Sequence, residues 1–165
     1  MSMMMLVIMH ARIIRHDQES NVCFFTRFVE RVSDCSVAHR RGISDGGIVK
    51  IDPDGHGPFD VICDSKYVVI QRRWDGSENF YRGWDDYKKG FGNLTGEFWL
   101  GNDYIHRLTK AGLTVLRVDL EDRDGVWKYA VYSSFVLEDE AHKYRVTVAN
   151  YSGTAGDSLI QFSGM

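Results

Sequence analysis

From Gly46 onward the chain consists of short β-rich runs separated by Gly and Asp, and this alternation most constrains its fold. Short runs that end in turn residues are typical of strands that pair with their neighbours in an antiparallel sheet. No segment repeats at a fixed period, which excludes a solenoid or a propeller. With 44% hydrophobic residues and only 2 Pro, the composition is that of a packed globular chain. The sequence therefore predicts an α+β domain with a central antiparallel sheet and short helices.

Two turns indicate how the strands connect. In Asp52-Pro53-Asp54-Gly55, Pro presets φ and Gly supplies a positive φ, so the flanking runs are expected to form a hairpin. The turn Asp122-Arg123-Asp124-Gly125 predicts a second hairpin. The expected strands are residues 48–51, 59–63, 67–73, 116–120, 127–131 and 144–148.

Two segments carry helix signals. Residues 84–89 have acidic residues early, basic residues late and a stop at Gly90, which suits the helix macrodipole. Residues 102–111 begin at Asn102, a capping residue, and stop at Gly112.

Residues 1–33 are expected to be a lead-in segment, helical or disordered. Between His10 and Asp34 apolar residues recur at a loosely helical spacing, with charges between them. We expect this segment to add little to the core. The apolar stretch Met3 to Met9 has no basic residue before it and a poor cleavage pattern, so it matches a signal peptide weakly. It is too short to span a bilayer.

No catalytic motif is visible. The six histidines lie outside any HExxH, nucleophile elbow or Cys-His arrangement. We predict that the protein is not an enzyme; a hydrolase on an unfamiliar site, supported if replacing one histidine abolished activity, is the competing hypothesis. The histidines are His10, His16, His39, His56, His106 and His142.

Charge argues against nucleic acid as a partner, since the net charge is −3. Arg72-Arg73-Trp74 and Tyr81-Arg82-Gly83-Trp84 interleave cations with aromatic rings, a pattern that could stack bases. Because Asp75, Asp85 and Asp86 cancel the positive field, structural cation–π packing is the favoured interpretation.

Other polar motifs are weak. Asp52, Asp54 and Asp60 lack the full spacing of a calcium loop, so a plain turn is favoured. The triplets at Asn93 and Asn150 satisfy the N-glycosylation rule, which matters only in a secreted protein. Three cysteines without a CxxC pair make a zinc site improbable and leave disulfide bonding open.

Two adjoining runs carry a specific resemblance. Residues 69–84, VIQRRWDGSENFYRGW, and residues 87–102, YKKGFGNLTGEFWLGN, strongly resemble the fibrinogen C-terminal domain family. The resemblance covers residues 34–165, which we expect to form one incomplete domain of that fold.

The resemblance implies a secreted, extracellular protein in which Cys35 and Cys63 form the first disulfide of the family. Closing a loop of about 28 residues would contribute about 3 to 4 kcal/mol in the chain-entropy model. Cys23 is left over; it either bridges two chains of a homo-oligomer or stays a free thiol. Asn93 and Asn150 become candidate glycosylation sites.

The chain stops at Met165, where the family continues into a calcium loop, a second disulfide and an aromatic ligand pocket. We therefore predict no metal or other cofactor and no C-terminal ligand-binding subdomain. In the family the final segment returns to pair within the central sheet. Its loss implies an unpaired strand edge and uncovered apolar surface.

The leading functional prediction is a non-enzymatic lectin of innate immunity, similar to ficolins and tachylectins, that binds acetylated sugars in its complete form. The alternative is a signalling or adhesion ligand for a protein receptor, like the angiopoietins. The fold does not separate these two activities. Neither interpretation includes a membrane span.

Overall fold

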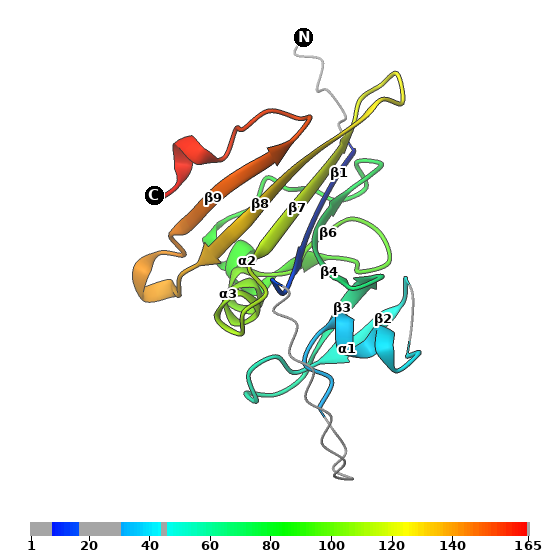
Figure 1. Cartoon of the computed structure of the whole chain (residues 1–165), viewed down its shortest axis with the longest axis vertical. Helices are drawn as coiled ribbons and strands as arrows, with labels where there is room; N and C mark the ends of the chain where they lie inside the picture. The colour runs from blue at the N-terminus through cyan, green and yellow to red at the C-terminus, as the bar shows by residue number, and fades with distance from the viewer. Residues whose placement is uncertain (1–7, 17–30, 44–45, 165) are drawn as a thin grey trace.

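The computed structural model describes residues 8–16, 31–43 and 46–164 of the chain. Its described strands form one antiparallel sheet in the order β2-β3-β4-β1-β7-β8-β9, with β6 paired to β4 and β5 paired to β6 (Figure 1). The strands are β1 Ile8–Ile14, β2 Ile48–Ile51, β3 Phe59–Asp64, β4 Tyr67–Arg73, β5 Phe91–Gly92, β6 Phe98–Trp99, β7 Val115–Glu121, β8 Trp127–Leu137 and β9 Val146–Gly153. The helices are α1 Cys35–Arg40, α2 Trp84–Lys89 and α3 Asn102–Lys110, with 3₁₀ turns at Glu140–His142 and Ile160–Phe162. This architecture confirms the predicted α+β class.

Both predicted hairpins are present. The β2–β3 turn is held by the Asp52 carboxylate, whose Oδ1 accepts a hydrogen bond from the Gly55 N–H at 2.8 Å. In the β7–β8 turn the Gly125 N–H donates to the Asp122 carbonyl at 3.1 Å. Gly55 and Gly125 have φ values of 84° and 77°, which only glycine adopts without strain.

The helices α2 and α3 lie where the sequence predicts them, with one correction. The N-cap of α3 is Gly101, and Asn102 makes no side-chain cap. The side-chain oxygen Oδ1 of Asn102 instead accepts a hydrogen bond from Trp99 Nε1 at 3.1 Å. The buried face of α3 carries Ile105 and Leu108, which anchor the helix to the core.

The prediction of a helix is wrong for residues 10–14, which belong to strand β1. The strand has period-2 alternation, in which Met9, Ala11 and Ile13 share one face. Ile13 is fully buried in the hydrophobic core, so this segment contributes to the core after all. The remainder of the expected lead-in helix, residues 17–30, lies outside the described residues.

The position of β1 also corrects the expected unpaired edge in the middle of the sheet. Strand β1 pairs antiparallel with β4 on one side and with β7 on the other. The main-chain groups in the middle of the sheet are therefore partnered by the N-terminal strand.

The last predicted strand begins later than expected. Lys143 and Tyr144 have φ values of 56° and 50°, so the chain turns through the left-handed region before β9 starts at Val146. The Tyr144 side chain is buried and its hydroxyl donates to Asp103 at the start of α3. The contact with α3 outweighs the strand propensity of this residue.

A disulfide ties α1 to β3. Asp34 caps α1, because its Oδ1 accepts a hydrogen bond from the Val37 N–H at 2.9 Å. Cys35, the first helical residue, is bonded to Cys63, and both side chains are fully buried. This is the pairing that the resemblance implies.

Candidate functional site

The most exposed aromatic side chains near the resembling motifs lie on the aromatic loop, which we define as residues 74–83 between β4 and α2. Tyr81 is 96% exposed and Trp74 is 54% exposed. Both rings are therefore open to solvent on one short segment.

The buried carboxylate of Glu97 holds the first half of the aromatic loop. Pairing of β6 with β4 sets Phe98 opposite Arg72 and so brings Glu97 beside the start of the loop. Its Oε1 accepts hydrogen bonds from the N–H groups of residues 74, 75 and 76 at 2.5, 2.9 and 2.9 Å. Its Oε2 accepts a fourth from the Glu78 N–H at 2.8 Å.

Those donors keep Glu97 ionised. Burial alone would raise the pKa of this carboxyl, because a low-dielectric site disfavours the charge. The four N–H donors outweigh burial and hold the pKa of Glu97 below its ordinary value. The carboxylate thus acts as an internal anion around which the loop folds.

The second half of the loop is fixed by Asn79 and by stacked cations. Asn79 Oδ1 accepts a hydrogen bond from the Tyr81 N–H at 2.9 Å, and its carbonyl accepts one from Arg82 Nε at 2.9 Å. The Arg82 guanidinium lies 5.0 Å from the ring centre of Phe91, and that of Arg73 lies 4.5 Å from Phe80. These contacts confirm the structural interpretation of the cation–aromatic pattern.

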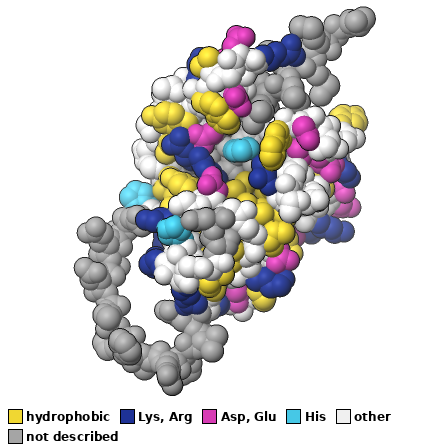
Figure 2. Space-filling view, turned by 90° about the vertical axis from the view of Figure 1, so that its right-hand side faces the viewer, with side chains coloured by type: hydrophobic (Ala, Val, Ile, Leu, Met, Phe, Trp, Pro, Cys, Tyr) yellow, Lys and Arg dark blue, Asp and Glu magenta, His cyan; other side chains and the backbone are white. Residues whose placement is uncertain are grey.

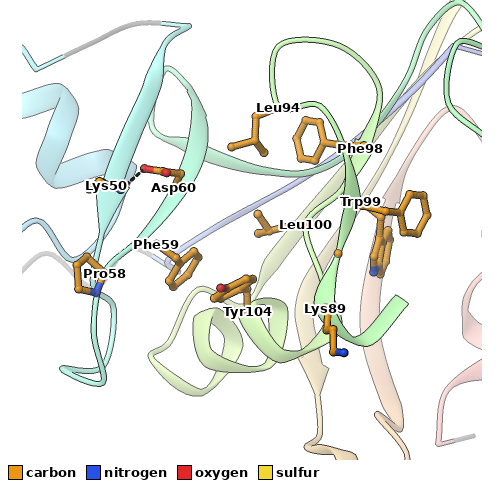
Figure 3. A pocket seen from close by; sticks show the side chains of 13 residues that line it. Lys50, Pro58, Phe59, Asp60, Lys89, Leu94, Phe98, Trp99, Leu100 and Tyr104 are labelled. Carbon is orange, nitrogen blue, oxygen red and sulfur yellow. Dashed lines mark hydrogen bonds and ion pairs between the residues drawn. The ribbon is translucent and has the colours of Figure 1, made fainter. Parts of the chain in front are cut away.

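A hollow of about 420 Å³ lies between β3 and the β6–α3 segment (Figure 3). Phe59 and Tyr104 stack at its floor with ring centres 4.3 Å apart, and the ion pair of Lys50 and Asp60 lies at one edge. Trp99 points to the other side of its strand (Figure 3). Since Phe59 is only 6% exposed, its ring is packed and offers no open face for a sugar.

A second cavity, the apolar groove of about 570 Å³, lies between the sheet and the helices α2 and α3. Among the polar side chains in its wall, Gln71 is 3% exposed and its Oε1 has no hydrogen-bond partner among the described residues. This groove matches the uncovered apolar surface that the resemblance implies. Its apolar wall includes Met9, Ala11, Trp99, Ile105, Leu116, Val118, Leu120, Tyr132 and Phe135.

The remaining predicted site residues do not converge. Asn93 lies before β6, Asn150 lies within β9, and both are exposed. Exposure makes both side chains accessible but does not test whether either carries a glycan. Cys23 lies outside the described residues, and its pairing stays a prediction. His106 and His142 contact the Leu137 carbonyl and Asp139 respectively, which are structural partners.

Asp54 belongs to an ion pair with Arg107. Arg107 donates from Nε and Nη2 to the Asp54 carboxylate at 3.0 and 2.6 Å, and these hydrogen bonds hold the pKa of Asp54 far below its ordinary value. Within the described part of the chain, no three His, Cys, Asp or Glu residues are grouped to hold a metal. The absence of a calcium site stays a prediction.

Charges are interspersed over the face that Figure 2 shows, where basic and acidic side chains alternate with hydrophobic ones. Such a surface has no single-sign field to attract a polyanion. None of the described helices is long and apolar enough to cross a membrane.

Sequence reasoning missed two groups. Glu97 was missed because its four N–H donors come from residues distant in sequence; an acid directly before the apolar run Phe98-Trp99-Leu100 was the available signal. Arg12, which bonds Asp64 and Asp119, was missed because residues 10–34 were interpreted as helical.

The described residues thus form one antiparallel sheet, with a disulfide between α1 and β3 and an aromatic loop held by internal hydrogen bonds. Residues 31–165 match the family of fibrinogen beta and gamma chains, C-terminal globular domain, and the chain belongs to this family. Membership confirms the predicted fold and the prediction that the protein is not an enzyme.

Individual relatives share this similarity. The chain is 49% identical to human fibroleukin over 132 residues, which are 76% of this chain and 30% of fibroleukin. It is 40% identical to human angiopoietin-related protein 7 over 141 residues, or 81% of this chain and 40% of the relative. The solved fibrinogen-like globe domain of human ANGPTL2 superposes with a TM-score of 0.77 at 40% identity, covering 80% of this chain and 64% of that domain. The chain therefore spans less than half the length of these curated relatives.

Proposed function

We propose that this protein is a ligand for a protein receptor or adhesion partner, and that it acts outside the cell. The relatives in the comparison include angiopoietin-related proteins and fibroleukin, and these favour the receptor-ligand alternative over the lectin interpretation. The family alone does not choose between partners, so the proposal depends on the surface.

The aromatic loop is the observation that carries the proposal. Tyr, Trp and Arg are the residues that contribute most to protein interfaces. Here Tyr81 and Trp74 are exposed on a segment already fixed by Glu97 and Asn79. A preformed loop loses little conformational entropy when it binds, so its contacts translate into affinity.

The buried disulfide supports an extracellular site of action. Bonds such as Cys35–Cys63 persist in oxidising compartments and are rare in the cytosol. In such a compartment Asn93 would be a glycosylation site; Thr95 Oγ1 donates to Asn93 Oδ1 at 2.8 Å on an exposed turn. Removal of N-glycans from secreted protein, followed by mass analysis, tests occupancy of Asn93 and Asn150.

The experiment is binding of fluorescently labelled protein to a panel of cultured animal cells, with and without trypsin treatment of the cells. We expect saturable binding that trypsin abolishes and that Tyr81→Ala weakens at least about tenfold, as for an interface hot spot. Trp127→Ala is the matched control, since Trp127 is 51% exposed but lies outside the loop.

Two outcomes would contradict the proposal. One is binding that survives trypsin but is lost when cell-surface glycans are removed. The other is equal weakening by Tyr81→Ala and Trp127→Ala. Retention of the protein on immobilised N-acetylglucosamine would support the lectin interpretation instead.

A further inference from the structure

Strand β1 lies out of sequence order in the sheet. It is the first strand of the chain, yet it separates β4 from β7. Among the described strands, β4 and β7 pair with β1 and not with each other. Without β1 the sheet would consist of two separate ladders, one containing β2 to β6 and one containing β7 to β9. The gap between them is called the β1 slot.

The β1 slot binds its strand along both edges. On the β7 side the register runs from Ile8 opposite Glu121 to Ile14 opposite Val115. On the β4 side it runs from Met9 opposite Arg73 to Ile13 opposite Val68, with an irregularity between Ala11 and Arg12. Main-chain pairing of this kind is the basis of strand addition in protein recognition, and here it occurs on two edges at once.

Side chains of the slot distinguish the two faces of the strand. On one face Ala11 and Ile13 are buried. On the other face Arg12 bonds Asp64 on β3 and, at 2.6 Å, Asp119 on β7. The slot therefore selects an extended segment in which a cation lies between two apolar residues.

The Asp119 carboxylate is held ionised for this role. Burial alone would raise its pKa, but hydrogen bonds from Arg117 and Arg12 outweigh burial and lower it. The Arg12 guanidinium also lies 5.2 Å from the ring centre of Tyr67. A strand without the cation would leave the Asp119 carboxylate, which is 12% exposed, with Arg117 as its single cation.

The covalent connection does not dictate which chain supplies the strand. Residues 15–34 separate β1 from α1. At about 3.3 Å per residue, twenty residues reach about 65 Å when extended. A domain of this length has a radius of gyration of about 15 Å. The β1 strand of one chain can therefore reach the slot of a second chain as well as its own.

We propose that the β1 slot is a strand-binding site that accepts β1 from a second copy of this chain, so that two chains exchange their first strands. Exchange of an identical element needs no new interface, because every contact already exists within one chain. The inference does not depend on the proposed receptor binding.

The test uses two variants of the full chain in a Cys23→Ser background. One carries Met9→Cys and the other carries Leu120→Cys, since these residues lie directly opposite each other in the β1–β7 register. The two are mixed, incubated at high concentration and oxidised. We expect a disulfide-linked dimer of the two variants on a non-reducing gel, because the register holds the two thiols opposite each other when β1 of one chain occupies the slot of the other.

Controls make each outcome decisive. The double variant Met9→Cys, Leu120→Cys must cross-link within one chain, which shows that the pair is reactive. Met9→Cys mixed with Leu116→Cys is out of register and should give at least about fivefold less dimer, since Leu116 lies opposite Ile13.

A peptide of residues 8–16 should compete with the dimer, and the same peptide with Arg12→Glu should compete at least about tenfold less. Efficient cross-linking within one chain, with no dimer between the variants, would overturn the proposal. Equal competition by both peptides would overturn the selectivity for the cation.

Discussion

Glu97 is the residue that holds the first half of the aromatic loop in place. Its carboxylate replaces, inside the protein, the anion that a cluster of main-chain N–H groups would otherwise bind from solvent. All four donors belong to the aromatic loop. The charge of one buried residue thereby determines the conformation of an exposed segment.

Glu97→Gln should destabilise the protein by about 2 kcal/mol, because hydrogen bonds to a charged acceptor are lost and an amide N–H₂ meets N–H donors. Urea unfolding measures the change. Glu140→Gln is the control: its exposed carboxylate pairs with Lys88 at the surface. We expect that control to change the midpoint very little. Equal effects of both substitutions would contradict the account.

The same residue makes stability depend on pH. Since the pKa of Glu97 is lowered in the folded protein from its ordinary value of 4.5, ionisation stabilises the fold above that pH. The contribution is lost as pH falls through the folded-state pKa. The difference in unfolding free energy between wild type and Glu97→Gln should therefore shrink as the pH falls below about 4.5. A constant difference would show that Glu97 does not titrate in this way.

At the scale of elements, β1 is the strand that joins two ladders, and Ile13 is its buried anchor. Ile13→Ala should cost about 2 to 4 kcal/mol, the usual range for a buried aliphatic side chain. Ile43→Ala, at a residue that is 48% exposed, is the matched control and should cost less than about 1 kcal/mol. Similar midpoints for the two variants in urea would place β1 outside the core.

The disulfide joins α1 to β3, which belongs to the ladder that contains β2 to β6. Replacing both Cys35 and Cys63 by Ser should lower the unfolding free energy by about 3 kcal/mol, because the reduced unfolded chain gains freedom. Unfolding of the wild type with and without a reductant should reproduce that difference. Identical curves would mean that the bond does not constrain the unfolded chain.

These elements show what a sequence can predict. The hairpins and α2 were predictable because their signals are local: Asp-Gly turns, and charges arranged along a helix. Strand β1 was not predicted, although Met9, Ala11 and Ile13 alternate with His10 and Arg12. Its pairing partners β4 and β7 are more than fifty residues away, and the apolar residues after it suggested a helix. The role of Glu97 was not predicted for the same reason, because the burial of its charge depends on N–H donors that lie elsewhere in the sequence.

At the scale of the whole molecule, the apolar groove is a cavity of about 570 Å³ beside the sheet. The dye 8-anilinonaphthalene-1-sulfonate should bind to the native protein there, with fluorescence that rises before the cooperative unfolding transition. Leu120→Lys, in the groove wall, should reduce the fluorescence at least about threefold. If the native protein does not increase the fluorescence of the dye, the groove is closed in solution.

The central claim is that a loop organised from within by Glu97 presents Tyr81 to a protein partner. A double-mutant cycle on cell binding tests it most directly, using wild type, Glu97→Gln, Tyr81→Ala and the double variant, each compared at a temperature where all are folded. We expect each single change to weaken binding and the double variant to bind no worse than Tyr81→Ala, since Glu97 acts through the loop. Fully additive losses, or a Tyr81→Ala protein that binds as well as wild type, would contradict it.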